Sequence, residues 1–191
     1  MNTPILIAFG SNIEPEKNLA FGMTRLHALF GVKAISTIYR TRALRTPSTP
    51  TGLSLPDFLN GALTIQTEPD PWTLRQTLKS IEQESGRVPG QPGWAPRTLD
   101  LDIALMGGLQ LNTPNLTIPD PDIPTRPFLA IPLAELAPTL IHPILKVSLN
   151  TLATRLVPDP TNMWPDPHQT ALFHNLLTTL PPCDPYRISL Q

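Results

Sequence analysis

Residues 94–102 read Trp94-Ala95-Pro96-Arg97-Thr98-Leu99-Asp100-Leu101-Asp102, and the apolar run Ile103-Ala104-Leu105-Met106 follows directly. If residues 99–106 are extended, the alternation of a strand places Asp100 and Asp102 on one face and the intervening apolar residues on the other. Two carboxylates at neighbouring positions of one face repel each other unless a cation lies near them. Hard carboxylate oxygens suit Mg²⁺. The stretch therefore predicts a strand that joins a sheet and carries a metal and phosphate site.

The acidic pair also has a simpler interpretation, as the solvated face of an edge strand. The Asp-x-Asp spacing alone is weak support for a metal site. Arg97 and Trp94 favour the ligand site, because a cation beside paired carboxylates and a ring at a loop mouth suit a nucleotide phosphate. We therefore expect Asp100 and Asp102 to hold a divalent cation together with a polyphosphate.

The elements around this strand follow from hydrophobic periodicity and turn residues. Leu19, Met23, Leu26 and Phe30 recur at helical spacing, and β-branched or aromatic runs bounded by glycine or proline indicate strands. The order βαββαβ predicts a ferredoxin-like α+β fold, with the middle two strands antiparallel and helices covering one face of the sheet. The expected elements are strand 5–9, helix 14–30, strand 32–41, strand 58–67, helix 70–86 and strand 99–106.

Proline content divides the chain. Many of its 25 prolines stiffen loops, and they become dense again from Pro158 onward. We expect residues 1–157 to form one catalytic domain and residues 158–191 a Pro-rich extension that lies on the domain or contacts a partner. Short helices are expected at 127–135, where irregular packing is the alternative, at 149–156 and at 171–180.

The composition limits the classes of ligand. A formal net charge of −1 and a pI near 6.4 exclude a broad basic surface for nucleic acid, so a few local cations must hold any anionic ligand. The single Cys183 excludes an internal disulfide, and the four histidines share no catalytic or metal-binding spacing. The N-terminal apolar run is too short for a signal peptide or membrane span. These features predict a cytoplasmic protein without nucleic-acid or membrane partners.

The segment 86–97, between the second helix and the acidic strand, has the composition of a lid. It holds three glycines and three prolines, with Arg87 and Arg97 near its ends. Hinged loops of this kind exclude water during phosphoryl chemistry, and a pair of arginines can neutralise the charge on a transferring phosphoryl group. The alternative is that both arginines are surface cations lying over apolar patches.

Two further pairs suit a flat heterocycle. Phe58 and Asn60 share one face of their strand, and Arg126 and Phe128 repeat the arrangement of a polar side chain two residues from a ring. An amide that both donates and accepts can hydrogen-bond a heterocycle beside a stacking ring. Without other support, ordinary packing is the better explanation of both pairs.

Six blocks of the chain match the order and approximate spacing of a known family. On these blocks the chain resembles the 6-hydroxymethyl-7,8-dihydropterin pyrophosphokinases of folate biosynthesis, over about residues 4–157. The Pro-Arg-Thr-Leu-Asp-Leu-Asp core is specific, and the proline-rich extension lies outside the resemblance. The blocks are Phe9-Gly10-Ser11-Asn12, Tyr39-Arg40-Thr41, Phe58-Leu59-Asn60, Glu82 with Gly86-Arg87, residues 94–102, and Arg126-Pro127-Phe128.

The resemblance implies a ferredoxin-like fold and transfer of the diphosphoryl group of ATP to the pterin hydroxymethyl group, with release of AMP. It implies that Asp100 and Asp102 hold two Mg²⁺ ions bridging the ATP phosphates, which Arg87 and Arg97 contact during transfer. Small molecules are then the partners. The residues implied on the pterin side are Thr41, Leu44, Phe58, Asn60, Trp94 and Phe128, and those on the ATP side are Glu82, Arg87, Arg97, Ile103, Thr117 and Arg126.

The chain also departs from the family pattern. Asp120 stands where a histidine is common, and Pro89, Gly90 and Gly93 occupy lid positions that are usually basic. Each lost charge-assisted contact to the triphosphate costs about 1–3 kcal/mol, which predicts weaker ATP binding or slower turnover. Two alternatives of other classes therefore stay open: a pterin- or nucleotide-binding module without catalysis, and another Mg²⁺-dependent phosphoryl transferase that uses the acidic pair.

Overall fold

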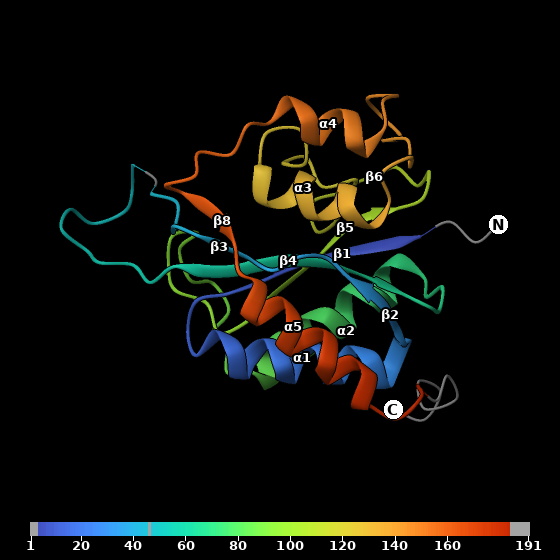
Figure 1. The fold of residues 1–191 in the computed structure, drawn as a ribbon, viewed down its shortest axis with the longest axis horizontal. Coiled ribbons are helices and arrows are strands. Elements are labelled where there is room, and N and C mark those ends of the chain that lie inside the picture. Colours follow the sequence, from blue (N-terminus) through green and yellow to red (C-terminus); the bar gives the residue numbers. More distant parts are fainter. Residues whose placement is uncertain (1–3, 46, 184–191) are drawn as a thin grey trace.

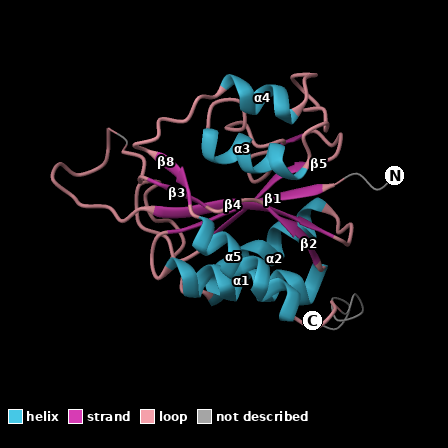
Figure 2. Cartoon of the chain, viewed as in Figure 1, coloured by secondary structure: helices cyan, strands magenta, loops and turns pink. Residues whose placement is uncertain are grey.

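The computed structural model describes residues 4–45 and 47–183 of the 191-residue chain. An antiparallel sheet with the strand order β5-β1-β4-β3-β8 forms its centre, and β2 also pairs with β4 (Figures 1 and 2). The elements are β1 (Ile5–Ser11), α1 (Pro15–Phe30), β2 (Val32–Ile35), β3 (Tyr39–Thr41), β4 (Phe58–Ile65), α2 (Pro71–Glu84), β5 (Asp100–Met106), β6 (Leu111–Asn112), β7 (Thr117–Ile118), α3 (Pro127–Leu136), α4 (Leu149–Arg155), β8 (Met163–Pro165) and α5 (Pro167–Thr179).

The α+β class and the ferredoxin-like order are confirmed, with one break in the expected second strand. Residues 32–41 form two strands, β2 and β3, and both pair antiparallel with β4 as expected. The pairing register shifts by one residue between them, and the Ser36 hydroxyl accepts the backbone N–H of Ala62 at 2.9 Å. A side chain therefore takes over part of the ladder where the extra residue is accommodated.

Helices cover both faces of the sheet, so the expectation of a single covered face was wrong. Helices α1, α2 and α5 lie on one side and α3 and α4 on the other (Figure 1). The reason lies in β1, whose side chains are buried at every position. Ile5, Ile7 and Phe9 pack into one apolar cluster, while Leu6 and Ala8 pack into the other. A strand that is apolar on both faces needs cover on both.

The residues at the start of α2 predict where this helix begins. Asp70 caps α2 by accepting the backbone N–H groups of Trp72 and Thr73 at 3.0 and 3.2 Å, and Pro71 occupies the first helical position. Proline is favoured there because its missing N–H leaves no donor unsatisfied. The apolar face of the helix then buries Leu74 and Leu78 against the sheet.

Part of the C-terminal extension lies on the domain. Strand β8 pairs with β3, and α5 packs against α1. Helix α5 begins at Pro167, four residues before the expected start at Ala171, because Asp166 caps it by accepting the backbone N–H of Gln169 at 3.0 Å. The side chain of Phe173 is fully buried in the apolar cluster beneath the sheet. The extension therefore completes this side of the core.

Replacing Phe173 by Ala is expected to destabilise the protein by about 3–5 kcal/mol, because a fully buried ring leaves a cavity. Equilibrium unfolding in urea measures the change. Leu172→Ala is the matched control, since Leu172 is 43% exposed and its truncation is expected to cost less than about 1 kcal/mol. Equal losses in both variants would contradict the packing of α5 described above.

Candidate active site

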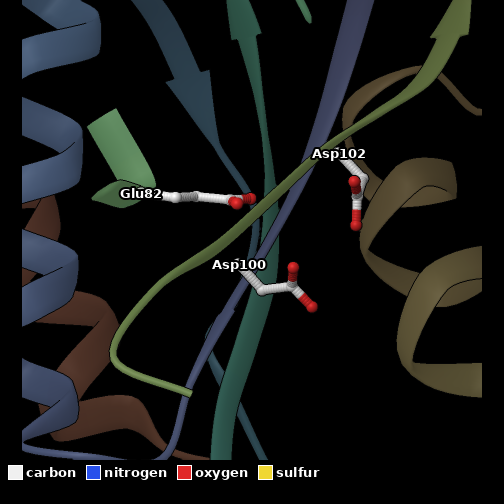
Figure 3. A group of neighbouring side chains, drawn as sticks. All are labelled: Glu82, Asp100 and Asp102. Carbon is white, nitrogen blue, oxygen red and sulfur yellow. The ribbon is translucent and has the colours of Figure 1, made fainter. Parts of the chain in front are cut away.

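The acidic pair lies on β5 as the alternation predicts. Asp100 stands opposite Gly10 and Asp102 opposite Ala8 in the neighbouring strand β1. Leu101 and Ile103 are buried in the apolar cluster between the sheet and helices α1 and α2. The two carboxylates project together to the other side of the strand (Figure 3). The expected separation of charged and apolar faces is therefore confirmed.

A third carboxylate joins the pair. Glu82 approaches β5 from α2 (Figure 3), and one carboxylate oxygen from each of Glu82, Asp100 and Asp102 lies within 4.8 Å of the others. The resemblance implies that Glu82 lies on the ATP side, but the sequence analysis did not group it with the aspartates. A signal was present, because Glu82 follows Ile81 and lies one turn after Leu78 on the buried stripe of α2. A charge there requires partners.

Glu82 is held by backbone and side chains together. It is only 3% exposed, and its Oε1 accepts the backbone N–H of Leu101 at 2.7 Å. This N–H lies on the open edge of β5, where no described strand pairs. Lys79 Nζ donates to Oε1 at 2.7 Å, and Arg87 Nη1 lies 3.4 Å from Oε2. Burial raises the pKa of the Glu82 carboxyl, and the charge of Lys79 opposes this rise.

The two arginines predicted at the ends of the lid converge on Asp100. Arg87 donates to Oδ1 and Arg97 to Oδ2 of that carboxylate. Burial alone would raise the pKa of Asp100, but the charges of Arg97 and Arg87 outweigh burial and lower it. Arg97 Nη2 also donates to the carbonyl of Gly93 at 3.1 Å, within the lid. A cation thus joins the lid to the acidic strand.

Three cavities are lined by the acidic pair or by its ion-pair partners. One of about 370 Å³ lies between α2 and the lid, and its lining includes both arginines, Lys79 and Glu82 but not Trp94. A second of about 170 Å³ is lined by Ile103 and Thr117 together with Asp102. The third, of about 180 Å³, is lined by Phe58, Asn60 and Phe128 with Asp100 and Asp102. Arg97 lines both this aromatic cavity and the cationic one, so the acidic pair lines the first and reaches the second through its arginine partner.

Two other residues expected on the pterin side, Thr41 and Leu44, lie next to the aromatic cavity. Thr41 lines the cavity beside it, and the Thr41 hydroxyl accepts the Nδ2–H of Asn60 at 2.6 Å. Leu44 and Arg126 line the same neighbouring cavity, of about 430 Å³, and Phe128 lines both cavities. Arg126 approaches Asp122, with Nε 3.6 Å from Oδ2. The structure therefore places Arg126 on the Leu44 side, whereas the resemblance places it with ATP.

Gly10 is a site residue that the sequence analysis missed. We expected it in the turn after β1, but it lies within the strand, opposite both Asn60 and Asp100. A Cβ atom on Gly10 would come within 2.4 Å of Asn60 Oδ1. Glycine is thus required for the close approach of the amide, and a glycine beside an apolar strand run was the available signal.

Comparisons with known proteins show the family to which the chain belongs. The family profile of 7,8-dihydro-6-hydroxymethylpterin-pyrophosphokinase (HPPK) matches residues 6–138. The chain belongs to the HPPK family. Relatives named 2-amino-4-hydroxy-6-hydroxymethyldihydropteridine pyrophosphokinase include one from Synechocystis, 37% identical over 84% of this chain and 78% of the relative. One from Haemophilus influenzae is 39% identical over 72% of this chain and 83% of the relative.

Solved structures support the HPPK fold. A Plasmodium falciparum HPPK-DHPS triple mutant matches with a TM-score of 0.62 and 11% identity. The match covers 81% of this chain and 43% of the Plasmodium chain, so this HPPK chain spans less than half of that longer protein. At such low identity the likeness concerns the fold alone.

Asp120 is the departure from the HPPK pattern that lies closest to the acidic pair. It lines both the Thr117 cavity and the aromatic cavity. Its backbone N–H donates to the carbonyl of Ala104 at 2.8 Å, and its Oδ1 accepts the N–H of Asp122 at 2.8 Å. Burial raises the pKa of its carboxyl, and the charges of Asp102, Asp122 and Asp100 raise it further.

If the phosphates bind at the acidic pair as expected, Asp120→Asn tightens ATP binding by about threefold to tenfold, because it removes a negative charge beside them and keeps the Oδ1 acceptor. It is also expected to raise stability at neutral pH. Since the folded-state pKa is raised, ionisation costs more in the folded protein, so wild-type stability falls as pH rises above the ordinary aspartate value of about 3.9.

Calorimetric titration with ATP and urea unfolding at several pH values measure both effects. The stability gain of Asp120→Asn is expected to disappear below about pH 3.9, where both side chains are neutral. Asp120→His, which supplies a donor, is expected to tighten ATP binding as well. Weaker ATP binding in Asp120→Asn would contradict this assignment and indicate that the carboxylate itself contributes to the site.

Proposed function

We propose that this chain transfers the diphosphoryl group of ATP to the hydroxymethyl group of 6-hydroxymethyl-7,8-dihydropterin, as its HPPK relatives are named to do. The observation that carries the proposal is that a cavity lined by Lys79, Arg87 and Arg97 adjoins, through Arg97, a cavity lined by two rings and an amide. Asp100 and Asp102 line the second cavity and form ion pairs with the cations of the first. A polyphosphate fits the first and a flat heterocycle the second. The transfer joins them at the acidic pair.

Mg²⁺ is the cation that fits the acidic pair. The donor set consists of carboxylate oxygens within 4.8 Å of one another, which are hard ligands. The two aspartates also form ion pairs with three cations of the chain, Lys79, Arg87 and Arg97. The negative charge of the site therefore attracts cations. Asp100 and Asp102 hold two ions in this proposal. Mg²⁺ bound there would neutralise negative charge on the phosphate oxygens.

The pterin lies between Phe58 and Phe128 in this proposal. Stacking between two rings favours a flat aromatic ligand, and Asn60 offers both donor and acceptor to its edge. Thr41 orients the Asn60 amide through the 2.6 Å hydrogen bond between them. Leu44 lines the adjoining cavity, and Trp94 closes over the site from the lid.

The arginines act on the triphosphate. The hydroxymethyl oxygen forms a bond to the β-phosphorus, the bond between this phosphorus and the α,β-bridging oxygen breaks, and AMP leaves with that oxygen. The hydroxyl proton passes to solvent. Arg87 and Arg97 remain charged and donate to the phosphoryl oxygens, which lowers the barrier because negative charge there is matched by fixed donors. Glu82, Ile103 and Thr117 complete the ATP side, whereas Arg126 lines the cavity beside Leu44.

The reaction consumes ATP and acts on a small molecule, so a cytoplasmic location and small-molecule partners belong to the same proposal. None of the helices in residues 4–45 and 47–183 is long and apolar enough to cross a membrane. The net charge of −1 argues against nucleic acid as a ligand.

A titration distinguishes the pterin enzyme from another phosphoryl transferase. Calorimetry with hydroxymethyldihydropterin, Mg²⁺ and α,β-methylene-ATP is expected to give pterin binding in the wild type and a loss of about tenfold or more in Asn60→Ala. Asn112→Ala, an exposed position on β6, is the control and is expected to bind as the wild type. Absence of pterin binding would reject the pterin assignment. In a parallel assay with ATP in place of the analogue, pterin binding without AMP formation would favour the inactive binding module instead.

A further inference from the structure

Lys79 is a cation at the acidic site that the proposed reaction does not use. It lies on α2, and its Nζ donates to Glu82 Oε1 at 2.7 Å, Asp102 Oδ1 at 3.0 Å and the carbonyl of Leu101 at 3.1 Å. An ammonium group has three donors. All three are therefore engaged, and the side chain, which is one-third exposed, is held at the edge of β5.

The chain's cations divide between the two aspartates. Arg87 and Arg97 pair with Asp100. Among the ion pairs of the described residues, Asp102 pairs with Lys79. Burial lowers the pKa of Lys79, but the charges of Asp102 and Glu82 outweigh burial and raise it, so the ammonium stays protonated. Asp102 thus has a positively charged partner of its own.

This partner stands where a metal ligand must be free. Mg²⁺ binds carboxylate oxygens at about 2.0–2.1 Å, and an ammonium hydrogen-bonded to the same Oδ1 repels it. Lys79 also lines both the lid cavity and the Thr117 cavity, as does Arg75 one helical turn earlier. A lysine displaced from Asp102 has open space on either side, close to where the triphosphate is proposed to lie.

We propose that Lys79 is an internal cation that competes with Mg²⁺ for Asp102 in the ligand-free protein and is released to the triphosphate when the metal binds. The inference rests on the proposed function, because Asp102 is assigned as a metal ligand there. Metal alone then binds weakly, and nucleotide favours metal binding by giving the lysine a new anionic partner. Pro89, Gly90 and Gly93 add no positive charge to the lid, and Lys79 supplies a cation to the same cavity from α2.

Two titrations test this role in the full-length protein. Electron paramagnetic resonance with Mn²⁺ alone is expected to show about fivefold tighter binding in Lys79→Gln than in the wild type, because the competing charge is gone. Calorimetry with α,β-methylene-ATP and Mg²⁺ is expected to show about threefold weaker nucleotide binding in the same variant. A merely structural lysine would weaken both. Lys79→Arg keeps the charge and is expected to bind Mn²⁺ weakly, as the wild type does.

The controls separate failure of this inference from failure of the proposed function. Lys17→Gln removes an equal charge from an exposed pair and is expected to change neither titration. Lys79→Met is a second neutral variant if Lys79→Gln fails to fold. Asp102→Asn is expected to lose Mn²⁺ binding and to abolish the effect of Lys79→Gln in the double variant.

Unchanged or weaker Mn²⁺ binding in the neutral Lys79 variants, with binding lost in Asp102→Asn, would overturn the role of Lys79 and leave the metal site standing. Mn²⁺ binding in Asp102→Asn equal to that of the wild type would overturn the metal site itself, and with it the premise of the inference.

Discussion

Asp102→Asn is expected to lower ATP turnover by a factor of at least about 10³, because the amide removes a charged metal ligand from the site of transfer. The fold is expected to survive. The Asp102 side chain is half exposed, and its ion pair with Lys79 is the contact that the substitution weakens. Removing a charge beside Asp120 also relieves repulsion. Formation of AMP measures turnover, and urea unfolding measures stability.

Glu84→Gln is the matched control for Asp102→Asn. Glu84 is a partly exposed carboxylate near the end of α2 that pairs with Arg25, and its neutralisation is expected to leave turnover within about twofold of wild type. Near-full activity of Asp102→Asn would contradict the two-metal assignment. It would support the simpler interpretation that the acidic pair is the solvated face of an edge strand.

Arg97→Ala is expected to lower kcat by about 10²–10³, because a guanidinium that meets the developing phosphoryl charge is lost. The local backbone is expected to hold its position. The Arg97 backbone N–H donates to Asn12 Oδ1 at 2.6 Å, and its carbonyl accepts from the backbone of Asn12 at 3.0 Å. Neither contact needs the side chain. Steady-state kinetics with ATP varied separate the loss in kcat from a change in KM.

Two variants accompany Arg97→Ala. Arg97→Lys is expected to recover only part of kcat, because an ammonium lacks the planar pair of donors that a guanidinium offers. Arg25→Ala removes an arginine from an ion pair remote from the acidic strand and is expected to be silent. Unchanged kcat in Arg97→Ala would support the alternative that the arginine is a surface cation.

The sequence predicted those features that depend on neighbours along the chain. The common face of Asp100 and Asp102 follows from strand alternation alone, and β5 was confirmed to within one residue at its start. The start of α2 follows from the Asp70-Pro71 cap. Each signal is contained within a few residues, so no tertiary contact was needed to interpret it.

Features that depend on packing were missed. Glu82 and Lys79 belong to the acidic site because α2 lies along the open edge of β5, a relation that helical spacing does not encode. The break between β2 and β3 depends on Ser36 bonding to a neighbouring strand. Helix α5 depends on Phe173 reaching the core beneath the sheet. In each case a contact distant in sequence overrides the local pattern.

The aromatic cavity is the clearest case of a feature that local sequence does not predict. Phe58 and Asn60 are on β4 and Phe128 is on α3, and nothing in their own segments predicts that they line one cavity. The family resemblance brought them together, and the structure places them side by side. Gly10 was recognised as a site residue only in the structure, where a Cβ atom at this position would clash with Asn60 Oδ1.

The identity of the nucleotide product tests the central claim most directly. ³¹P NMR of the folded protein with ATP, Mg²⁺ and hydroxymethyldihydropterin follows AMP, ADP and the pterin phosphates in one sample. We predict one AMP for each pterin diphosphate, with no ADP and no reaction when the pterin is left out. Formation of ADP, or no pterin-dependent turnover by protein that binds both substrates, would contradict diphosphoryl transfer at the Asp100 and Asp102 site.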